Sequence, residues 1–262
     1  MDYNKVEEPV MIETLTDRVF VIGSAGSSNT TIITGSEGTV VVDTTLFPEK
    51  ARRIRDFVKE LARKPVKLVV NTHYHPDHTF GNQEFEDIDI VASSLTLEKM
   101  KDMDNDEYLE HLPKIKKIVF PSETFDEEWD GFNIIIKRVG GHTPDSSFVY
   151  LKSERILITG DLVFNGLHAE IVSDSDIESW IDILGELSKF DAEWIVPGHG
   201  VPKDATCLKL MQKYLMKFRR LIRGTINYSE ILTDENFSKR GFSELFSWSV
   251  DNLLNRKAKQ LG

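Results

Sequence analysis

The first part of the chain alternates short apolar runs with small, polar breaks. β-Branched residues dominate the runs at 18–22, 30–34 and 39–43, and Gly, Ser and Asn are frequent in the stretches between them. Such runs, separated by turn residues, are typical of strands that follow one another in an antiparallel order. The region 10–43 therefore predicts a meander of short strands.

Helices and further strands are predicted beyond this meander. The segment from Pro48 to about residue 63 carries apolar residues at helical spacing, among them Ile54 and Val58. A continuous apolar run at 66–71 predicts a buried strand. The remaining elements follow the same two patterns: strands at 88–92, 132–139, 147–151, 155–159 and 193–196, helices at 95–103, 177–189 and 205–223, and two short helices within 228–259.

The stretch 101–130 follows neither pattern. It is acidic, and its apolar residues show no regular spacing. We interpret it as a surface insertion that forms much of the substrate wall, in the manner of a lid. No low-complexity linker and no internal repeat divides the chain. We therefore predict one domain over 1–262, with a core at 10–200 that carries the functional motifs and a helical C-terminal part at 201–262.

The composition is that of a globular protein with an acidic balance. Hydrophobic residues make up 40% and charged residues 29%, and the formal net charge is −11. Nucleic acids and anionic membranes bind basic surfaces, so we expect neither as a partner. The sequence shows no apolar leader and no membrane-spanning run, which favours a cytoplasmic location. The one cysteine, Cys207, has no internal disulfide partner and is expected to pack as a buried thiol.

Histidine is scarce in this chain and unevenly distributed. Three of the seven histidines are His73, His75 and His78, and Asp77 lies among them, directly after the predicted strand 66–71. Imidazole nitrogens and carboxylate oxygens are ligands of zinc and, less selectively, of iron or manganese. Functional residues concentrate in loops that a rigid scaffold positions. The cluster therefore predicts a metal site.

Three other predicted strands are followed by a candidate ligand beside Gly or Pro. These ligands are His142, Asp161 and His199. Glycine adopts turns that other residues avoid and lets two backbones approach closely. Each such element alone is weak evidence for a metal ligand, since a lone histidine beside glycine is usually a surface loop residue. Four elements of this kind in one chain favour one shared site.

The whole series resembles the full ligand set of the metallo-β-lactamase superfamily, in the form found in glyoxalase II and many β-lactamase-like hydrolases. The resemblance covers roughly residues 10–200 and includes Asp43 as an aspartate that orients the ligands. It implies an α+β fold, a four-layer αβ/βα sandwich of two mixed β-sheets flanked by helices, with the site where the sheets meet. It also implies the ligands, namely His73, His75 and His142 for one metal, Asp77, His78 and His199 for the other, and Asp161 as the bridge.

The resemblance and the ligand chemistry together predict a hydrolase. Two metal ions about 3.5–4 Å apart share a water, lower its pKa and polarise a scissile bond. We expect two zinc ions, with iron or manganese as other metals that these ligands accept, and a small ester, thioester, lactone or related substrate. A metal-bridging hydroxide is the expected nucleophile, with Asp77 as the catalytic residue that orients it. His75 favours zinc, because the flavodiiron members carry a glutamate there.

Two other functions stay open on the sequence. One is an oxidoreductase that resembles the mononuclear iron persulfide dioxygenases of the same fold. The complete ligand set argues against it, because a single metal would leave Asp77, His78 and His199 unused. The other is a true β-lactamase, although those enzymes lack the equivalent of Asp161.

Residues outside the ligand series are weaker candidates for substrate contact. His168 and Asn165 lie just beyond Asp161, although ordinary loop polarity explains them as well. The expected partner is a small-molecule substrate, and a homodimer is left open. A basic group near the C-terminus either holds substrate carboxylates, as glyoxalase II requires, or forms a solvated helix face: Arg219, Arg220, Arg223, Lys239 and Arg240.

Overall fold

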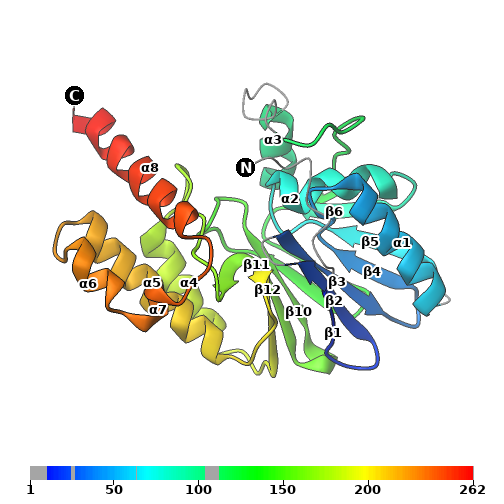
Figure 1. Cartoon of the computed structure of the whole chain (residues 1–262). Helices are drawn as coiled ribbons and strands as arrows, with labels where there is room; N and C mark the ends of the chain where they lie inside the picture. Colours follow the sequence, from blue (N-terminus) through cyan, green and yellow to red (C-terminus); the bar gives the residue numbers. More distant parts are fainter. Residues whose placement is uncertain (1–10, 25–26, 63, 104–111, 262) are drawn as a thin grey trace.

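The strands of the protein form two sheets that lie against one another in the middle of the molecule (Figure 1). The computed structural model describes residues 11–24, 27–62, 64–103 and 112–261. The first sheet has the order β1-β2-β3-β4-β5-β6-β7, antiparallel from β1 to β4 and parallel from β4 to β7. Its strands are β1 (Met11–Thr14), β2 (Val19–Ser24), β3 (Ser27–Thr34), β4 (Thr39–Val42), β5 (Val66–Val70), β6 (Asp89–Ser93) and β7 (Glu123–Phe125).

The second sheet has the order β12-β11-β10-β9-β8, with β11 and β12 parallel and the other neighbours antiparallel. The pairing of His199 with Ser28 joins β12 to β3, so the two sheets meet at that point. The strands of this sheet are β8 (Glu128–Gly131), β9 (Ile134–Arg138), β10 (Ser147–Leu151), β11 (Ile156–Asn165) and β12 (Trp194–Gly200).

The main core lies between the sheets and is built from β-branched residues of both. Val42 and Val70 of the first sheet pack in one cluster with Ile136, Ile156 and Val196 of the second, and all five side chains are buried. Removing this apolar surface from water is the main force that holds the two sheets face to face.

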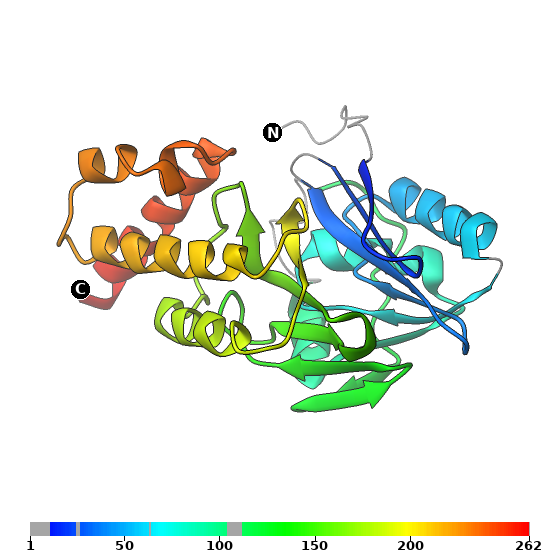
Figure 2. The ribbon, with the colours of Figure 1, turned by 90° about the horizontal axis from the view of Figure 1, so that it is seen from below.

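Helices cover the outer face of each sheet. α1 packs Ile54 and Val58, the residues expected from the helical spacing, on the first sheet. α4 and α5 cover the second sheet on the opposite side of the molecule (Figure 2). The layers are therefore helix, sheet, sheet and helix, which confirms the predicted αβ/βα sandwich with two mixed sheets. The helices are α1 (Pro48–Ala62), α2 (Pro76–Thr79), α3 (Ser94–Met103), α4 (Ile177–Leu187), α5 (Thr206–Ile222), α6 (Tyr228–Leu232), α7 (Glu235–Ser238) and α8 (Ser243–Leu261), with short 3₁₀ helices η1 (Phe80–Phe85) and η3 (Lys152–Glu154).

Two predictions of local structure are wrong. The acidic stretch 101–130 is not irregular throughout, because it contains β7 and most of β8, which form edge strands of the two sheets. Its residues 104–111 lie outside the described part of the chain. The C-terminal tail holds three helices instead of two, because Asn227 and Asp234 each cap the start of a separate short helix before α8.

β11 and β12 continue further than predicted, and this changes the setting of two candidate ligands. The strands end at Asn165 and Gly200. Their pairing is irregular, because the register shifts on both sides of Gly160. Asp161 and His199 therefore lie inside irregular strands and not in loops beyond them. Irregular pairing of this kind re-aims side chains and is frequent beside active sites.

The structure also bears on the expectations for the thiol and for a membrane. Cys207 is buried against α4 and the second sheet, and burial raises the pKa of its thiol to about 12, as expected for a packing residue. Among the helices of the described residues, none has both the length and the apolar character needed to cross a bilayer.

Candidate metal centre

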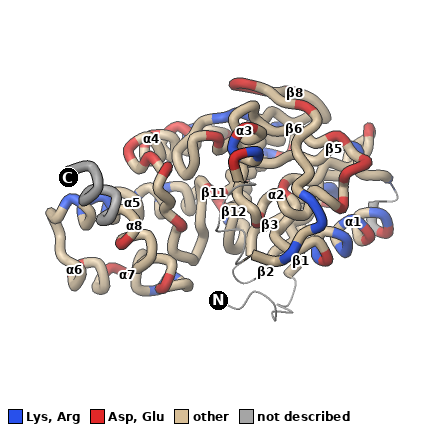
Figure 3. Tube along the Cα trace, turned by 90° about the horizontal axis from the view of Figure 1, so that it is seen from above, with Lys and Arg blue, Asp and Glu red and all other residues tan. Residues whose placement is uncertain are grey.

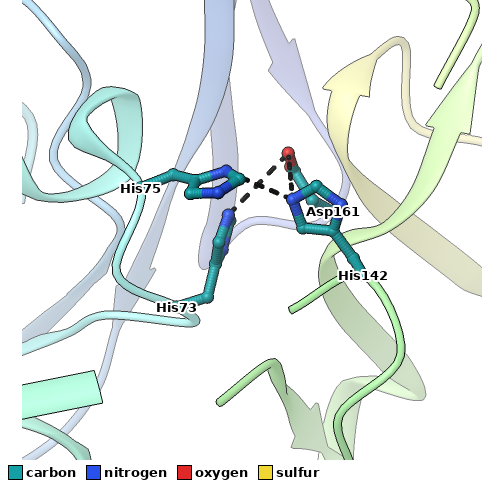
Figure 4. A group of neighbouring side chains, drawn as sticks. All are labelled: His73, His75, His142 and Asp161. Carbon is teal, nitrogen blue, oxygen red and sulfur yellow. Dashed lines mark hydrogen bonds and ion pairs between the residues drawn. The ribbon is translucent and has the colours of Figure 1, made fainter. Parts of the chain in front are cut away.

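The seven candidate ligands, which we call the metal centre, converge at the edge where the sheets meet. Figure 4 shows two side chains from the turn after β5, and two from β11 and the loop after β9, pointing toward one another. Their ligand atoms fall into two groups, and within each group all of these atoms lie within 4.8 Å of one another. The groups are His73, His75, His142 and Asp161, and Asp77, His78 and His199.

Asp161 is the residue that connects the two groups. Its Oδ2 atom lies 3.8 Å from Nε2 of His73 and 3.6 Å from Nε2 of His142. Its Oδ1 atom lies 3.1 Å from Nε2 of His78, and Oδ2 lies 3.5 Å from Nε2 of His199. One carboxylate thus faces nitrogens of both groups.

Two glycines allow the ligand-bearing segments to come this close. At Gly198 a Cβ atom would lie 1.9 Å from Oδ1 of Asp161, so no side chain fits between β12 and that carboxylate. Gly141, just before His142, has a φ of +103°, which side-chain-bearing residues rarely adopt. The glycines beside the candidate ligands therefore have a physical role, as their position in the sequence suggested.

Asp43 contacts the metal centre through hydrogen bonds with Thr72 and His78. Its Oδ1 accepts the backbone N–H of Thr72 at 2.8 Å, and its Oδ2 accepts the Thr72 hydroxyl at 2.8 Å. Nδ1 of His78 also lies 2.8 Å from Oδ2. A carboxylate oxygen accepts hydrogen bonds, so this contact places a hydrogen of His78 on Nδ1 and directs Nε2 at Asp161. The orienting role that the resemblance implies for Asp43 would act through this contact.

We expect Asp43→Asn to lower metal affinity by about 10- to 100-fold, the usual effect of removing a partner of a metal-binding histidine. The asparagine tolerates the left-handed backbone of this residue (φ 61°), so the change acts on the hydrogen bonds to His78 and Thr72 without straining the backbone. A competition titration against a chromophoric chelator measures the affinity. Asp87→Asn, an exposed surface variant, is the control, and equal affinities in both variants would refute the role of Asp43.

Burial keeps the imidazoles of the first group neutral. It lowers the pKa of His142 to about 3 and holds that of His73 well below its usual range, because a charged ring is poorly solvated there. Nε2 of His73 and both carboxylate oxygens of Asp161 are buried without a hydrogen-bond partner. Buried nitrogen and carboxylate atoms without a hydrogen-bond partner are costly unless protons or a metal ion lie between them. The residues therefore fit a bound metal.

The two imidazoles of the second group, in contrast, are protonated when no metal is bound. Burial opposes the charged form of His199, but the carboxylates of Asp161 and Asp77 outweigh it and raise the pKa of His199 to about 10. The pKa of His78 is raised well above its usual range by Asp161, Asp77 and Asp43 in spite of burial. Without a metal, protonated imidazoles thus balance the carboxylates at neutral pH, and a metal has to displace those protons.

Metal binding at pH 7 is therefore expected to release protons and to tighten as the pH rises, by about tenfold per pH unit for each proton displaced. Calorimetric titration of the metal-free protein in two buffers of different ionisation enthalpy counts the protons. An observed binding heat that is the same in both buffers would show that no proton leaves and would contradict this account of His78 and His199.

The weaker candidates lie away from the metal centre or are engaged elsewhere. His168 is buried against the C-terminal helices, where its Nδ1 lies 3.1 Å from the hydroxyl of Tyr214. Asn165 donates to the carbonyl of Val201. Most of the basic group forms structural contacts, which supports a scaffold role: Arg219 and Arg223 pair with Glu178, Lys239 pairs with Glu235, and Arg240 donates to the carbonyls of Phe164 and Leu167.

Glu170 is a polar residue of the site that the sequence reasoning missed. Its Oε2 atom lies 3.7 Å from Nδ1 of His75. Burial, together with the charges of Asp77 and Asp161, raises the pKa of the Glu170 carboxyl to about 8. A lone glutamate in a connecting loop carries no sequence signal, since it belongs to no motif and to no predicted element.

Comparison with known proteins places this geometry in a family. The model of the metallo-beta-lactamase superfamily matches residues 23–199. The alpha subunit of 2,4-dinitroanisole O-demethylase from Nocardioides sp. is 33% identical over 198 residues, covering 73% of this chain and 56% of that protein. Metallo-beta-lactamase type 2 from Bacillus cereus is 27% identical over 191 residues, covering 71% of this chain and 72% of that protein.

A solved structure shows the same fold. The metallo-beta-lactamase from Pontibacter korlensis superposes with a TM-score of 0.66 at 25% identity, covering 79% of this chain and 99% of that one. Two of the curated relatives are longer proteins: the match covers 56% of the Nocardioides protein and 60% of beta-lactamase-like protein 2 homolog from Caenorhabditis elegans. The family model spans the metal centre from β2 to His199, and the fold agrees, so the chain belongs to the metallo-β-lactamase superfamily.

Proposed function

We propose that the protein is a hydrolase that uses two zinc ions to cleave a small ester, thioester, lactone or related bond. The observation that carries this proposal is the position of Asp161. Its two oxygens face both groups of donors, with Oδ1 3.1 Å from Nε2 of His78 and Oδ2 3.6 Å from Nε2 of His142. A site for one metal would not need a carboxylate that faces two sets of imidazoles.

One ion would be held by His73, His75 and His142. The other would be held by Asp77, His78 and His199, and Asp161 would contact both. Imidazole and carboxylate donors without a thiolate suit a catalytic zinc site that keeps a position open. When bound, two zinc ions supply an activated water at neutral pH and polarise the bond that is cut.

We assign the catalytic role to Asp77, and its exposure and contacts support this assignment. Its side chain is 26% exposed, whereas that of Asp161 is buried, so it lies where solvent reaches the metal centre. Oδ2 of Asp77 lies 3.1 Å from Nε2 of His199. Burial alone would raise the pKa of Asp77, but the neighbouring His78 and His199 outweigh it and lower this pKa to about 2. An ionised carboxylate in this position accepts a hydrogen bond from the attacking water and orients it.

The names of the relatives widen the range of bonds to be tested. One relative is a demethylase of 2,4-dinitroanisole, which is an aryl methyl ether, and another is a linear primary-alkylsulfatase from Pseudomonas sp.. The match covers 56% and 41% of these proteins, so neither activity transfers with the shared fold. An aryl ether and a sulfate ester are therefore included with the esters as test substrates.

A turnover screen on zinc-loaded protein tests the proposal. It covers lactones, thioesters, aryl esters, an aryl methyl ether, sulfate and phosphate esters and a β-lactam. We expect hydrolysis of at least one class, and a loss of more than about a hundredfold in Asp77→Asn, since a group that orients the nucleophile typically contributes that much. Asp87→Asn should retain the activity. No turnover of any class, or full activity in Asp77→Asn, would refute the proposal.

A further inference from the structure

The ring of His142 is held differently from the rings of His73 and His78. Nδ1 of His78 lies 2.8 Å from Oδ2 of Asp43, and Nδ1 of His73 lies 3.1 Å from the hydroxyl of Thr72. Each of these two rings therefore has a polar contact that sets its angle. Nδ1 of His142, in contrast, is buried and has no hydrogen-bond partner among the described residues. Other contacts must set the orientation of this ring.

Two buried aromatic side chains contact the ring of His142. The ring of Trp180 meets it edge-on, with 5.4 Å between the ring centroids and 63° between the planes. The ring of Phe164 meets it at 5.9 Å and 65°. Both distances lie in the range in which aromatic rings attract one another in edge-to-face arrangements. Trp180 and Phe164 are both buried in a close-packed core, so neither ring has room to turn away.

Hydrogen bonds fix Trp180 relative to both ligand-bearing segments. Its indole Nε1–H donates to the carbonyl of Leu162 at 2.9 Å, directly after Asp161 on β11. The hydroxyl of Ser175, just before α4, donates to the carbonyl of His142 at 2.6 Å. Trp180 is thus anchored to the strand that carries Asp161, and its helix begins beside the loop that carries His142.

The amphipathic pattern of α4 keeps Trp180 on its buried face. The charged residues of this helix are exposed and acidic, and Figure 3 shows them in red: Glu178, Asp182 and Glu186. The buried residues belong to the core cluster on the second sheet: Trp180, Ile181, Leu184 and Leu187. An apolar stripe of this kind holds the helix against the sheet, so the place of the indole does not depend on bound metals.

We propose that Trp180 is a positioning residue of the metal centre, which together with Phe164 holds the ring of His142 by packing in place of a hydrogen bond. In this orientation Nε2 of His142 lies 3.6 Å from Oδ2 of Asp161. A ring that is already fixed loses little rotational freedom when a metal binds, so ordering it costs little of the binding free energy. The inference rests on the proposed function, since it presumes metals in the centre.

Cobalt affinity, measured in two variants that each keep one group of donors, tests the inference without any substrate. His199→Ala keeps the first group intact, and His142→Ala keeps the second. Competition against a chromophoric chelator gives the dissociation constant in each background. Trp180→Met fills much of the space of the indole without a ring. It should weaken cobalt binding about tenfold in the His199→Ala background and less than about twofold in the His142→Ala background.

Phe218→Leu is the matched control. Phe218 is fully buried in the same core cluster as Trp180, but its ring packs against Tyr214 and Phe246. This variant loses core packing as Trp180→Met does, and it should change cobalt affinity by less than about twofold in both backgrounds. Trp180→Phe keeps a ring beside His142 and should recover part of the affinity that Trp180→Met loses.

An equal loss of affinity in both backgrounds for Trp180→Met, or a loss no larger than that of Phe218→Leu, would overturn the inference. If Trp180→Met does not fold, Phe164→Leu decides, because the ring of Phe164 contacts His142 and also stacks on His199 at 5.1 Å. It should weaken cobalt binding in both backgrounds, and unchanged affinity in the His199→Ala background would overturn the inference. If cobalt binding follows the expected pattern but no substrate in the screen is hydrolysed, the proposed hydrolase function fails and the positioning role of Trp180 stands.

Discussion

Asp161→Asn is expected to lose one of the two proposed metal ions and to reduce the proposed hydrolysis by more than about a hundredfold. The carboxylate faces Nε2 of His142 and of His78 from its two oxygens, so it contacts donors of both groups. Removal of a residue that only orients a metal ligand lowers metal affinity or activity by about 10- to 100-fold, and removal of a direct ligand lowers them further. Metal analysis by mass spectrometry and a rate assay on the same sample measure the two effects.

Asparagine has nearly the same shape as aspartate, so the loss should come from the charge and not from packing. Asp87→Asn serves as the matched control, because that carboxylate is an exposed partner of Arg55 and removing it changes stability little. Two metals and full activity in Asp161→Asn would contradict the bridging role.

Removal of the metals is expected to abolish activity and to lower the melting temperature by about 10 °C. A metal that binds the folded state and not the unfolded state stabilises the protein by about 4 kcal/mol when the free metal concentration is a thousandfold above the dissociation constant. For a chain of this size, each kcal/mol shifts the melting temperature by about 2–4 °C. Part of the loss is offset because His78 and His199 take up protons and balance Asp77 and Asp161 when the metals leave.

Thermal unfolding before and after treatment with a chelator, followed by re-addition of zinc, measures this difference. Activity and melting temperature should return together on re-addition. A chelated protein that has verifiably lost its metal but keeps its melting temperature and its activity would show that the seven residues are not a metal centre.

Much of the fold could be predicted from the sequence, because its strands carry a strong local signal. The β-branched run 39–43 becomes the buried strand β4, and the spacing of Ile54 and Val58 places α1 on the sheet. The ligand series was informative for a related reason. Each ligand follows or continues an apolar run, and these strands end or bend where the sheets meet at the pair of His199 and Ser28.

The features that the sequence did not reveal depend on contacts between distant segments. β7 has three residues, too few for a pattern, and it is a strand because the edge of β6 offers hydrogen-bond partners. Glu170 reaches His75 because Ser249, in α8, anchors the backbone beside it. No spacing rule connects residues so far apart in the chain, so tertiary packing alone brings this carboxylate to the metal centre.

The central claim is that the protein binds two zinc ions, and the metal content tests it most directly. The protein is purified without added chelator and loaded with zinc or with iron. Mass spectrometry counts the ions per chain, and anomalous diffraction places them. The account predicts about two zinc ions per chain, one beside His73, His75 and His142 and one beside Asp77, His78 and His199, with Asp161 between them. A single iron per chain at the first group, with the second group without metal, would contradict it.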